Sequence, residues 1–130
     1  MLRFGTAMAA IDEFLILGGG SGDRSRPTYT WTVYMKELAF SLGDYFFCHA
    51  GIRPDVPLDR QLESDLLWIR EPFLSWEGDC GKIVVHGHTV DEAPVIRGNR
   101  IGIDTGACWT GRLTCLVMEG TERRFLRTGR

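Results

Sequence analysis

The stretch Lys82-Ile83-Val84-Val85-His86-Gly87-His88 decides the fold class of this chain. It is an apolar run that stops at a glycine, as a buried strand does. A second short run, Tyr45-Phe46-Phe47-Cys48-His49, opens into Ala50-Gly51 and has the same character. Each run therefore predicts a buried strand with a histidine at its carboxyl end.

The chain downstream of these runs predicts consecutive short strands. Residues 94–96 and 100–104 flank Gly98-Asn99, which is a hairpin signal. Residues 112–118 and 122–126 flank Glu119-Gly120-Thr121 and predict a second hairpin. The last third of the chain is thus expected to be β-structure.

The chain upstream predicts helices. Residues 1–17 are apolar and rich in alanine, and a glycine run over residues 18–22 would end such a helix. Apolar residues recur at helical spacing over residues 31–42 and stop at Gly43. A similar stripe over residues 58–69 precedes Pro72. Helices mixed with single strands, followed by strands, predict a layered α/β fold in one domain over residues 1–130.

Composition narrows the classes of function. Hydrophobic residues make up 44% of the chain, charged residues 25%, and the net charge is -2. This balance is typical of globular proteins. It lacks the excess of basic residues that proteins with a nucleic-acid partner carry. No apolar run approaches the roughly 18 residues of a membrane span, and the start lacks the layout of a signal peptide. We therefore expect a cytoplasmic protein without a membrane partner, with its four cysteines reduced.

The three histidines of the chain are the strongest candidates for chemistry. His49, His86 and His88 each follow a predicted strand and adjoin glycine, alanine or both. Open α/β sheets bind their ligands at this end of the strands, and small neighbours let a metal or a phosphate approach the backbone. The glycine run could also cradle a phosphate, but it lacks the GK(S/T) ending of a P-loop. Cys48 cannot pair with His49 as a nucleophile, because adjacent strand residues face opposite sides.

Four segments in order resemble calcineurin-like metallophosphoesterases of the bacterial serine/threonine protein phosphatase type. Cys48-His49-Ala50-Gly51-Ile52-Arg53-Pro54 resembles their HAG segment, and Val84-Val85-His86-Gly87-His88-Thr89 resembles their GHT segment. Residues 65–71, Asp-Leu-Leu-Trp-Ile-Arg-Glu, are similar to a DLLW stretch, and residues 99–107 resemble the strand pair after GHT. Residues 15–20 look like the loop before HAG. The resemblance covers nearly the whole chain and corresponds to the C-terminal half of such a domain.

The resemblance implies a role for each candidate residue. His49 and His88 would be ligands of one metal in a two-metal centre, where neutral imidazole suits Mn, Fe or Zn. Arg70 would hold the substrate phosphate, although a surface charge at a helix end would look the same. His86 would share the strand face of His88 and support it from beneath the site. Asp104 would either orient a ligand histidine or cap the turn before Gly106.

The departures from the family concern the other half of the metal site. The family's GDxHG, GDxxDRG and GNH(D/E) motifs are absent, and the single asparagine, Asn99, is followed by arginine. We therefore expect a partial metallophosphoesterase sandwich, with mixed sheets flanked by helices, that lacks the N-terminal half and is inactive alone. Its substrate would be a phosphorylated protein or a nucleotide, such as a dinucleoside polyphosphate. The alternatives are a non-catalytic module that binds or complements an N-terminal half, and a fragment without an independent role.

Overall fold

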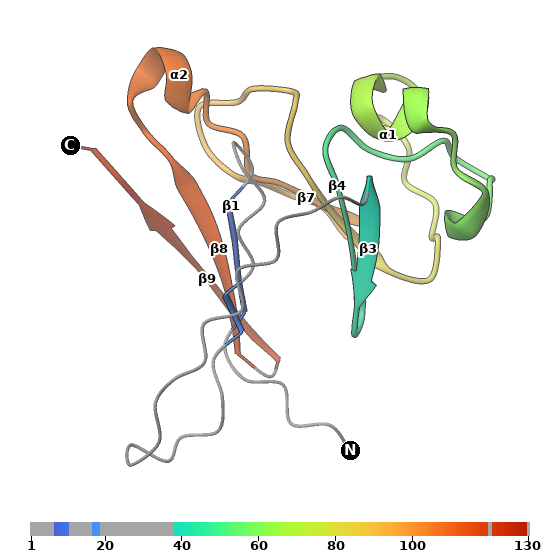
Figure 1. Ribbon diagram of the computed structural model, residues 1–130, viewed down its shortest axis with the longest axis horizontal. Helices are drawn as coiled ribbons and strands as arrows, with labels where there is room; N and C mark the ends of the chain where they lie inside the picture. Colours follow the sequence, from blue (N-terminus) through green and yellow to red (C-terminus); the bar gives the residue numbers. More distant parts are fainter. Residues whose placement is uncertain (1–6, 11–16, 19–37, 120, 130) are drawn as a thin grey trace.

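A computed structural model describes residues 7–10, 17–18, 38–119 and 121–129, which form two β-sheets with few helices (Figure 1). The larger sheet contains, in spatial order, β3 (Ala39–Leu42), β4 (Tyr45–Cys48), β5 (Ile83–His86), β7 (Arg100–Gly102) and β6 (Val95–Ile96). Its three central strands β4, β5 and β7 run parallel, and the two edge strands are antiparallel to their neighbours. The predicted α/β fold with mixed sheets is confirmed.

The smaller sheet joins the two ends of the described chain. It contains, in spatial order, β2 (Leu17–Gly18), β1 (Ala7–Ala10), β8 (Thr114–Glu119) and β9 (Glu122–Arg127). All its neighbours are antiparallel, and Ala7 lies opposite Met118 in the register. The predicted final hairpin is therefore present as β8 and β9.

The two sheets pack face to face around the main core. Side chains alternate across a strand, so every second residue of the central strands points to this interface. The buried residues of the interface lie on β4, β5, β7 and β8, except for Ile103, which directly follows β7. They are Phe47, Val85, Ile101, Ile103, Leu116 and Met118. Burial of this apolar surface holds the two sheets together.

The other face of the larger sheet is covered by α1 (Glu63–Trp68) and the loop that follows it (Figure 1). The intervening residues of β4 and β5 point to this side and form a second core with residues of α1 and the adjoining loops: Phe46, Cys48, Ala50, Ile52, Leu66, Ile69, Phe73 and Val84. The molecule thus has three layers, with the larger sheet in the middle. None of the four cysteines, all of which lie in the described part, forms a disulfide in the structure.

The helices are shorter than the sequence predicts. The stripe over residues 58–69 gives a 3-10 turn, η1 (Leu58–Arg60), and then α1, because Gln61 and Leu62 are extended. The side-chain Nε2 of Gln61 donates to the carbonyl oxygens of Arg53 and Val56, which favours the break over a continuous helix. A short helix that the sequence did not predict, α2 (Ala107–Thr110), follows β7. In the described part of the chain, no helix has the length and apolar character needed to cross a membrane.

Two predicted helices are wrong where the structure describes them. Residues 7–10 form β1, Leu17–Gly18 form β2 and residues 39–42 form β3. Leu38 lies in a bend, and the rest of both predicted helices and of the glycine run lies outside the described residues. β3 pairs with β4 across a turn at Gly43, and Phe40 stacks on Phe47 with ring centroids 4.7 Å apart. Sheet pairing and this buried contact override the helical propensity of the segment.

Candidate metal and phosphate site

His49 and His88 come together at the carboxyl edge of the larger sheet. β4 and β5 are parallel neighbours, so the segments that follow them emerge at the same edge. The amide of Gly87 donates a hydrogen bond of 2.8 Å to the carbonyl oxygen of His49, which ties the two segments together. The two imidazole rings lie 5.1 Å apart between centroids, at an angle of 57°.

His88 occupies a tight turn rather than a strand. Its φ is +68°, a left-handed conformation that residues other than glycine rarely adopt. The amide of Thr89 donates to the carbonyl oxygen of Gly87 at 2.7 Å, so His88 is the centre of a three-residue turn. Because the chain turns here, the expectation that His86 and His88 share a strand face is wrong. Strained backbone of this kind gathers at functional sites, where the surrounding structure maintains it.

The ring of His88 has unused hydrogen-bonding capacity. Its Nε2 is buried without a hydrogen-bond partner among the described residues, and the same holds for the hydroxyl of Thr89. Burial lowers the pKa of His88, and the charge of Arg70 and the proximity of His49 lower it further. The neutral imidazole is therefore favoured, which is the form that can ligate a metal.

His86 is a structural histidine whose two ring nitrogens are both occupied. Its Nε2 accepts from Nη1 of Arg100 at 3.2 Å, and its Nδ1 donates to the carbonyl oxygen of Gly87 at 3.1 Å. The guanidinium can only donate and the carbonyl can only accept, so these contacts fix the neutral tautomer with the proton on Nδ1. Phe73 packs edge-on against the ring, and burial lowers the pKa of His86 to about 4. The residue holds the Gly87 backbone from beneath the site.

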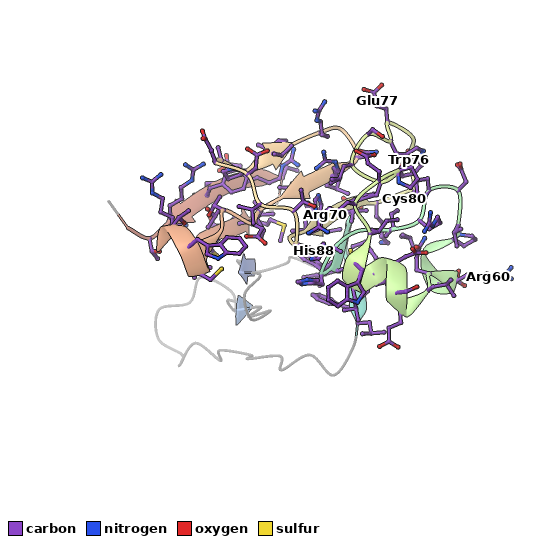
Figure 2. All side chains as sticks on the ribbon, turned by 90° about the horizontal axis from the view of Figure 1, so that it is seen from above. Arg60, Arg70, Trp76, Glu77, Cys80 and His88 are labelled. Atoms are coloured by element: carbon purple, nitrogen blue, oxygen red, sulfur yellow. The ribbon has the colours of Figure 1, made fainter. Side chains whose placement is uncertain are left out.

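Arg70 and Trp68 flank His88 from the segment at the end of α1. Figure 2 shows Arg70 beside His88, in agreement with its effect on the pKa of His88. The indole of Trp68 stands perpendicular to the imidazole of His88, with 5.7 Å between ring centroids. Between them, Ile69 is extended and buried in the second core. Trp68 and Arg70 are both exposed, so the two side chains project outward from the core on either side of Ile69.

The carboxylate of Asp104 caps a turn instead of accepting a hydrogen bond from His49 or His88. Its Oδ1 accepts from the amide of Gly106 at 2.9 Å, which is the turn-capping role that the sequence left open. Its charge nevertheless acts to raise the pKa of both His86 and His88, so it lies near them. The residue therefore contributes to the electrostatics of the edge while capping the turn that leads to α2.

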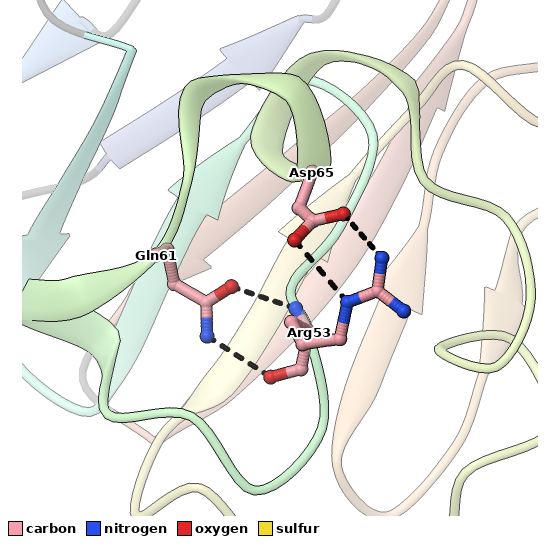
Figure 3. Close-up of polar contacts among 3 residues, drawn as sticks. All are labelled: Arg53, Gln61 and Asp65. Carbon is pink, nitrogen blue, oxygen red and sulfur yellow. Dashed lines mark hydrogen bonds and ion pairs between the residues drawn. The ribbon is translucent and has the colours of Figure 1, made fainter.

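A polar clamp that the sequence did not reveal fixes α1 to the loop after His49 (Figure 3). The Arg53 guanidinium donates to both carboxylate oxygens of Asp65, from Nη2 at 2.6 Å and from Nε at 3.2 Å. The side chain of Gln61 bonds the amide and the carbonyl of Arg53, at 2.6 Å and 3.0 Å. Asp65 and Arg53 lie within the two motifs quoted above, but a separation of twelve residues carries no periodic signal of pairing.

The donor set at this edge is partial. Two imidazoles, those of His49 and His88, are close enough to act together, and the described residues contain no group of three or more His, Cys, Asp or Glu side chains that could hold a metal. The buried, unpartnered Nε2 of His88 fits a metal ligand, whereas the occupied nitrogens of His86 do not. The residues present therefore suit one wall of a metal site and supply no bridging carboxylate.

A large hollow lies at the opposite, amino edge of the parallel strands. It measures about 990 Å³ and is lined by the 74–82 loop, the hairpin turn at residues 96–99 and Asp44. Trp76 and Glu77 of this loop lie apart from His88 in Figure 2. The Nδ2 of Asn99 donates to the carbonyl oxygens of Trp76 and Gly78, which ties the hairpin turn to the loop across the hollow. No sequence pattern predicts this hollow.

Comparison with known proteins supports the fold. No protein-family model and no curated protein matches this chain. Among solved structures, one of a candidate diadenosine tetraphosphatase is similar, with a TM-score of 0.54 and 24% sequence identity. The likeness covers 67% of this chain and 48% of that one, so the match spans about half the length of the solved protein. At this identity the comparison establishes a shared α/β fold.

Proposed function

We propose that this chain is part of a metal-dependent phosphoesterase, in which His49 and His88 bind a divalent metal and Arg70 contacts the substrate phosphate. One observation carries the proposal: two imidazoles meet at the carboxyl ends of parallel strands, and one has a buried nitrogen without a partner in the part of the chain that the structure describes. The neighbouring Arg70 supplies a permanent positive charge with a planar donor fork, which suits a phosphate. The motif resemblance and the shared fold point the same way.

Each residue of the edge has a defined task in this proposal. A bound divalent cation would supply Lewis-acid stabilisation to a phosphoryl oxygen. His88 offers its neutral ring because burial and Arg70 disfavour the imidazolium. His86 holds Gly87 and thereby the turn at His88, and the clamp between Arg53 and Asp65 holds the helix that leads to Arg70. The carboxylate and asparagine ligands that the family uses are not among these residues, so we infer weak metal binding and little turnover for the chain by itself.

The substrate class has two candidates. The motif resemblance favours phosphomonoesters on protein, hydrolysed with manganese as in the serine/threonine protein phosphatase type. The solved neighbour, a candidate diadenosine tetraphosphatase, favours a dinucleoside polyphosphate. A third reading, a non-catalytic module that binds phosphate or complements an N-terminal half, retains the same histidines and predicts binding without turnover.

Metal titration tests the proposal directly. Calorimetric titration of the chain with Mn²⁺ or Zn²⁺ is expected to show one weak site, and His49→Ala and His88→Ala should each reduce its affinity at least about tenfold, since each removes one ligand. Glu77→Gln is the matched control, because this exposed carboxylate lies on the loop at the amino edge, apart from His88. Equal affinity in the wild type and both alanine variants would refute the metal site.

Turnover separates the catalytic reading from the binding module. Wild-type chain and His88→Ala would be assayed with 4-nitrophenyl phosphate and with diadenosine tetraphosphate in the presence of Mn²⁺. Metal-dependent turnover that His88→Ala abolishes would establish a catalytic chain. Metal binding without turnover on either substrate would favour the non-catalytic module.

A further inference from the structure

We propose that Trp68 is a stacking platform for the base of a nucleotide whose phosphate is held by Arg70, so that the site takes nucleoside phosphates. The proposal rests on the proposed function, because it assigns the substrate class of the same edge. Trp68 is 69% exposed, although indole is among the side chains that gain most from burial. An open indole beside a candidate metal ligand and a phosphate-binding arginine calls for a partner that is aromatic and anionic.

The geometry places the two recognition groups on one segment. Buried Ile69 separates Trp68 from Arg70 and fixes both to project away from the second core. The indole approaches His88 at 5.7 Å, and the charge of Arg70 reaches the same ring. A ligand with its phosphate at Arg70 and His88 therefore has the indole within one linking group of that phosphate. In a nucleotide the ribose is such a link.

The segment is held in place before any ligand arrives. The carboxylate of Asp65 is bound by Arg53, and the amide of Ala50 donates to the carbonyl oxygen of Leu66 at 2.7 Å, so α1 is tied to the loop of His49 (Figure 3). The amide of Ile69 donates to the carbonyl oxygen of Asp65 and closes the helix. A platform that is already ordered loses little conformational entropy when a flat ring stacks on it.

The surroundings of the indole favour a nucleobase over an aliphatic side chain. The groups that flank it, His88 and Arg70, are polar or charged, and Trp68 does not line the hollow at the amino edge. A nucleobase combines a π-face with polar edges, and each of the bases can stack on an indole. An aliphatic side chain from a phosphoprotein would need a concave apolar pocket instead.

Paired ligands and paired variants test the platform. Dissociation constants for adenosine 5′-monophosphate and ribose 5-phosphate would be measured by calorimetry with Mn²⁺ on wild type, Trp68→Leu, Trp68→Phe and Trp109→Leu. Trp109 is the matched control, because it is 78% exposed on α2. The wild type should bind the nucleotide about five- to 100-fold more tightly than the sugar phosphate, as one base stacked on one indole does. That ratio should fall to about one in Trp68→Leu and survive in Trp68→Phe and Trp109→Leu.

The outcomes distinguish this inference from the proposed function. Two results would overturn the platform and leave the phosphoesterase proposal standing, provided that both ligands bind in a metal-dependent way. One is a ratio of the two dissociation constants near one in the wild type, and the other is a ratio that Trp68→Leu leaves unchanged. Adenosine has no phosphate, so adenosine binding that Trp68→Leu abolishes, with no effect of Mn²⁺ on any ligand, would support the platform and refute the metal site. A third outcome uses a peptide in which leucine flanks phosphoserine. If binding of this peptide depends on Trp68 and binding of the nucleotide does not, the platform is also overturned.

Discussion

The two edges of the parallel strands differ in a way that separates shape from chemistry. The amino edge has a hollow of about 990 Å³, where the side chain of Asn99 bonds two carbonyl oxygens of the facing loop. The carboxyl edge also has an open hollow, of about 770 Å³, lined by residues 90–92, Thr105, Thr110 and Arg112. It differs in holding a non-glycine residue, His88, in a left-handed turn with its ring Nε2 buried and without a partner among the described residues. Backbone strain beside an unpartnered candidate ligand therefore marks the candidate site better than volume does.

The largest expected effect tests how far the carboxyl edge depends on the core beneath it. Phe73 is fully buried, packs on His86 and lies beneath the guanidinium of Arg100. Phe73→Ala should reduce the free energy of unfolding by about 3–5 kcal/mol through lost burial and a cavity. Ile96→Ala at the amino edge should cost less than about 1 kcal/mol, since this side chain is exposed. Urea denaturation measures both, and equal losses would contradict the difference between the edges.

The next effect is a pH dependence that belongs to the carboxyl edge. The folded pKa of His86 is about 4, below the unfolded value near 6.5, because of burial and, more weakly, the charge of Arg100. Between these pH values the unfolded chain binds more protons, so stability is present above pH 6.5 and is lost as the pH falls toward 4. The contribution is about 3 kcal/mol. Asp104 and His88 also face this ring and modulate the same window.

The variant His86→Gln isolates that contribution. Its amide oxygen can still accept from Arg100, but it has no proton to gain. The difference in unfolding free energy between wild type and variant should change by about 3 kcal/mol from pH 7 to pH 4. A constant difference across this range would show that His86 is not held neutral by burial.

Glycines at the two edges provide a third comparison. A Cβ on Gly51, in the loop after His49, would lie 2.2 Å from the buried Phe73 ring, whereas a Cβ on Gly98 in the amino-edge turn would meet nothing within 4 Å. Gly51→Ala should therefore cost about 2 kcal/mol or more by overpacking, and Gly98→Ala should lie within about 0.5 kcal/mol of the wild type. Thermal unfolding of the two variants side by side checks this, and a harmless Gly51→Ala would show that the loop can move away from Phe73.

The smallest expected effect has the opposite sign. His88→Gly should stabilise the chain by about 1 kcal/mol relative to His88→Ala, because only glycine adopts a positive φ without penalty. Both variants lack the imidazole, so their difference in unfolding free energy measures the turn alone. If the two variants unfold at the same denaturant concentration, the backbone at residue 88 is not strained.

The sequence predicts the parts of the fold that depend on local pattern. The central strands β4 and β5 and both late hairpins follow from apolar runs and turn residues, and they are confirmed. The segments at residues 7–10 and 39–42 are strands because distant or adjacent strands pair with them, which a helical composition does not reveal. α2 is four residues long and leaves too short a pattern to detect.

The candidate site could be predicted from the sequence only in part, because local pattern shows residue type and position but not tertiary contacts. His49 and His88 stood out by residue type and position at strand ends, and the structure brings them together. The different states of His86 and His88 were hidden, because they depend on the turn at Gly87 and on Arg100 from another strand. Trp68 and the clamp between Arg53 and Asp65 were also hidden, since exposure and ion pairing arise only after folding.

The pairing of β1 with β8 has a consequence for how the chain folds. Ala7 lies opposite Met118, so this contact closes almost the whole length of the chain. Hairpins such as β8 with β9 join near neighbours and can form within microseconds, whereas a closure of this span raises the contact order and slows the final step. On the ribosome, β1 is made early and must wait for β8 to emerge before it gains its partner. We therefore expect folding to finish at the smaller sheet, on a millisecond-to-second timescale, with the amino-terminal strand added last.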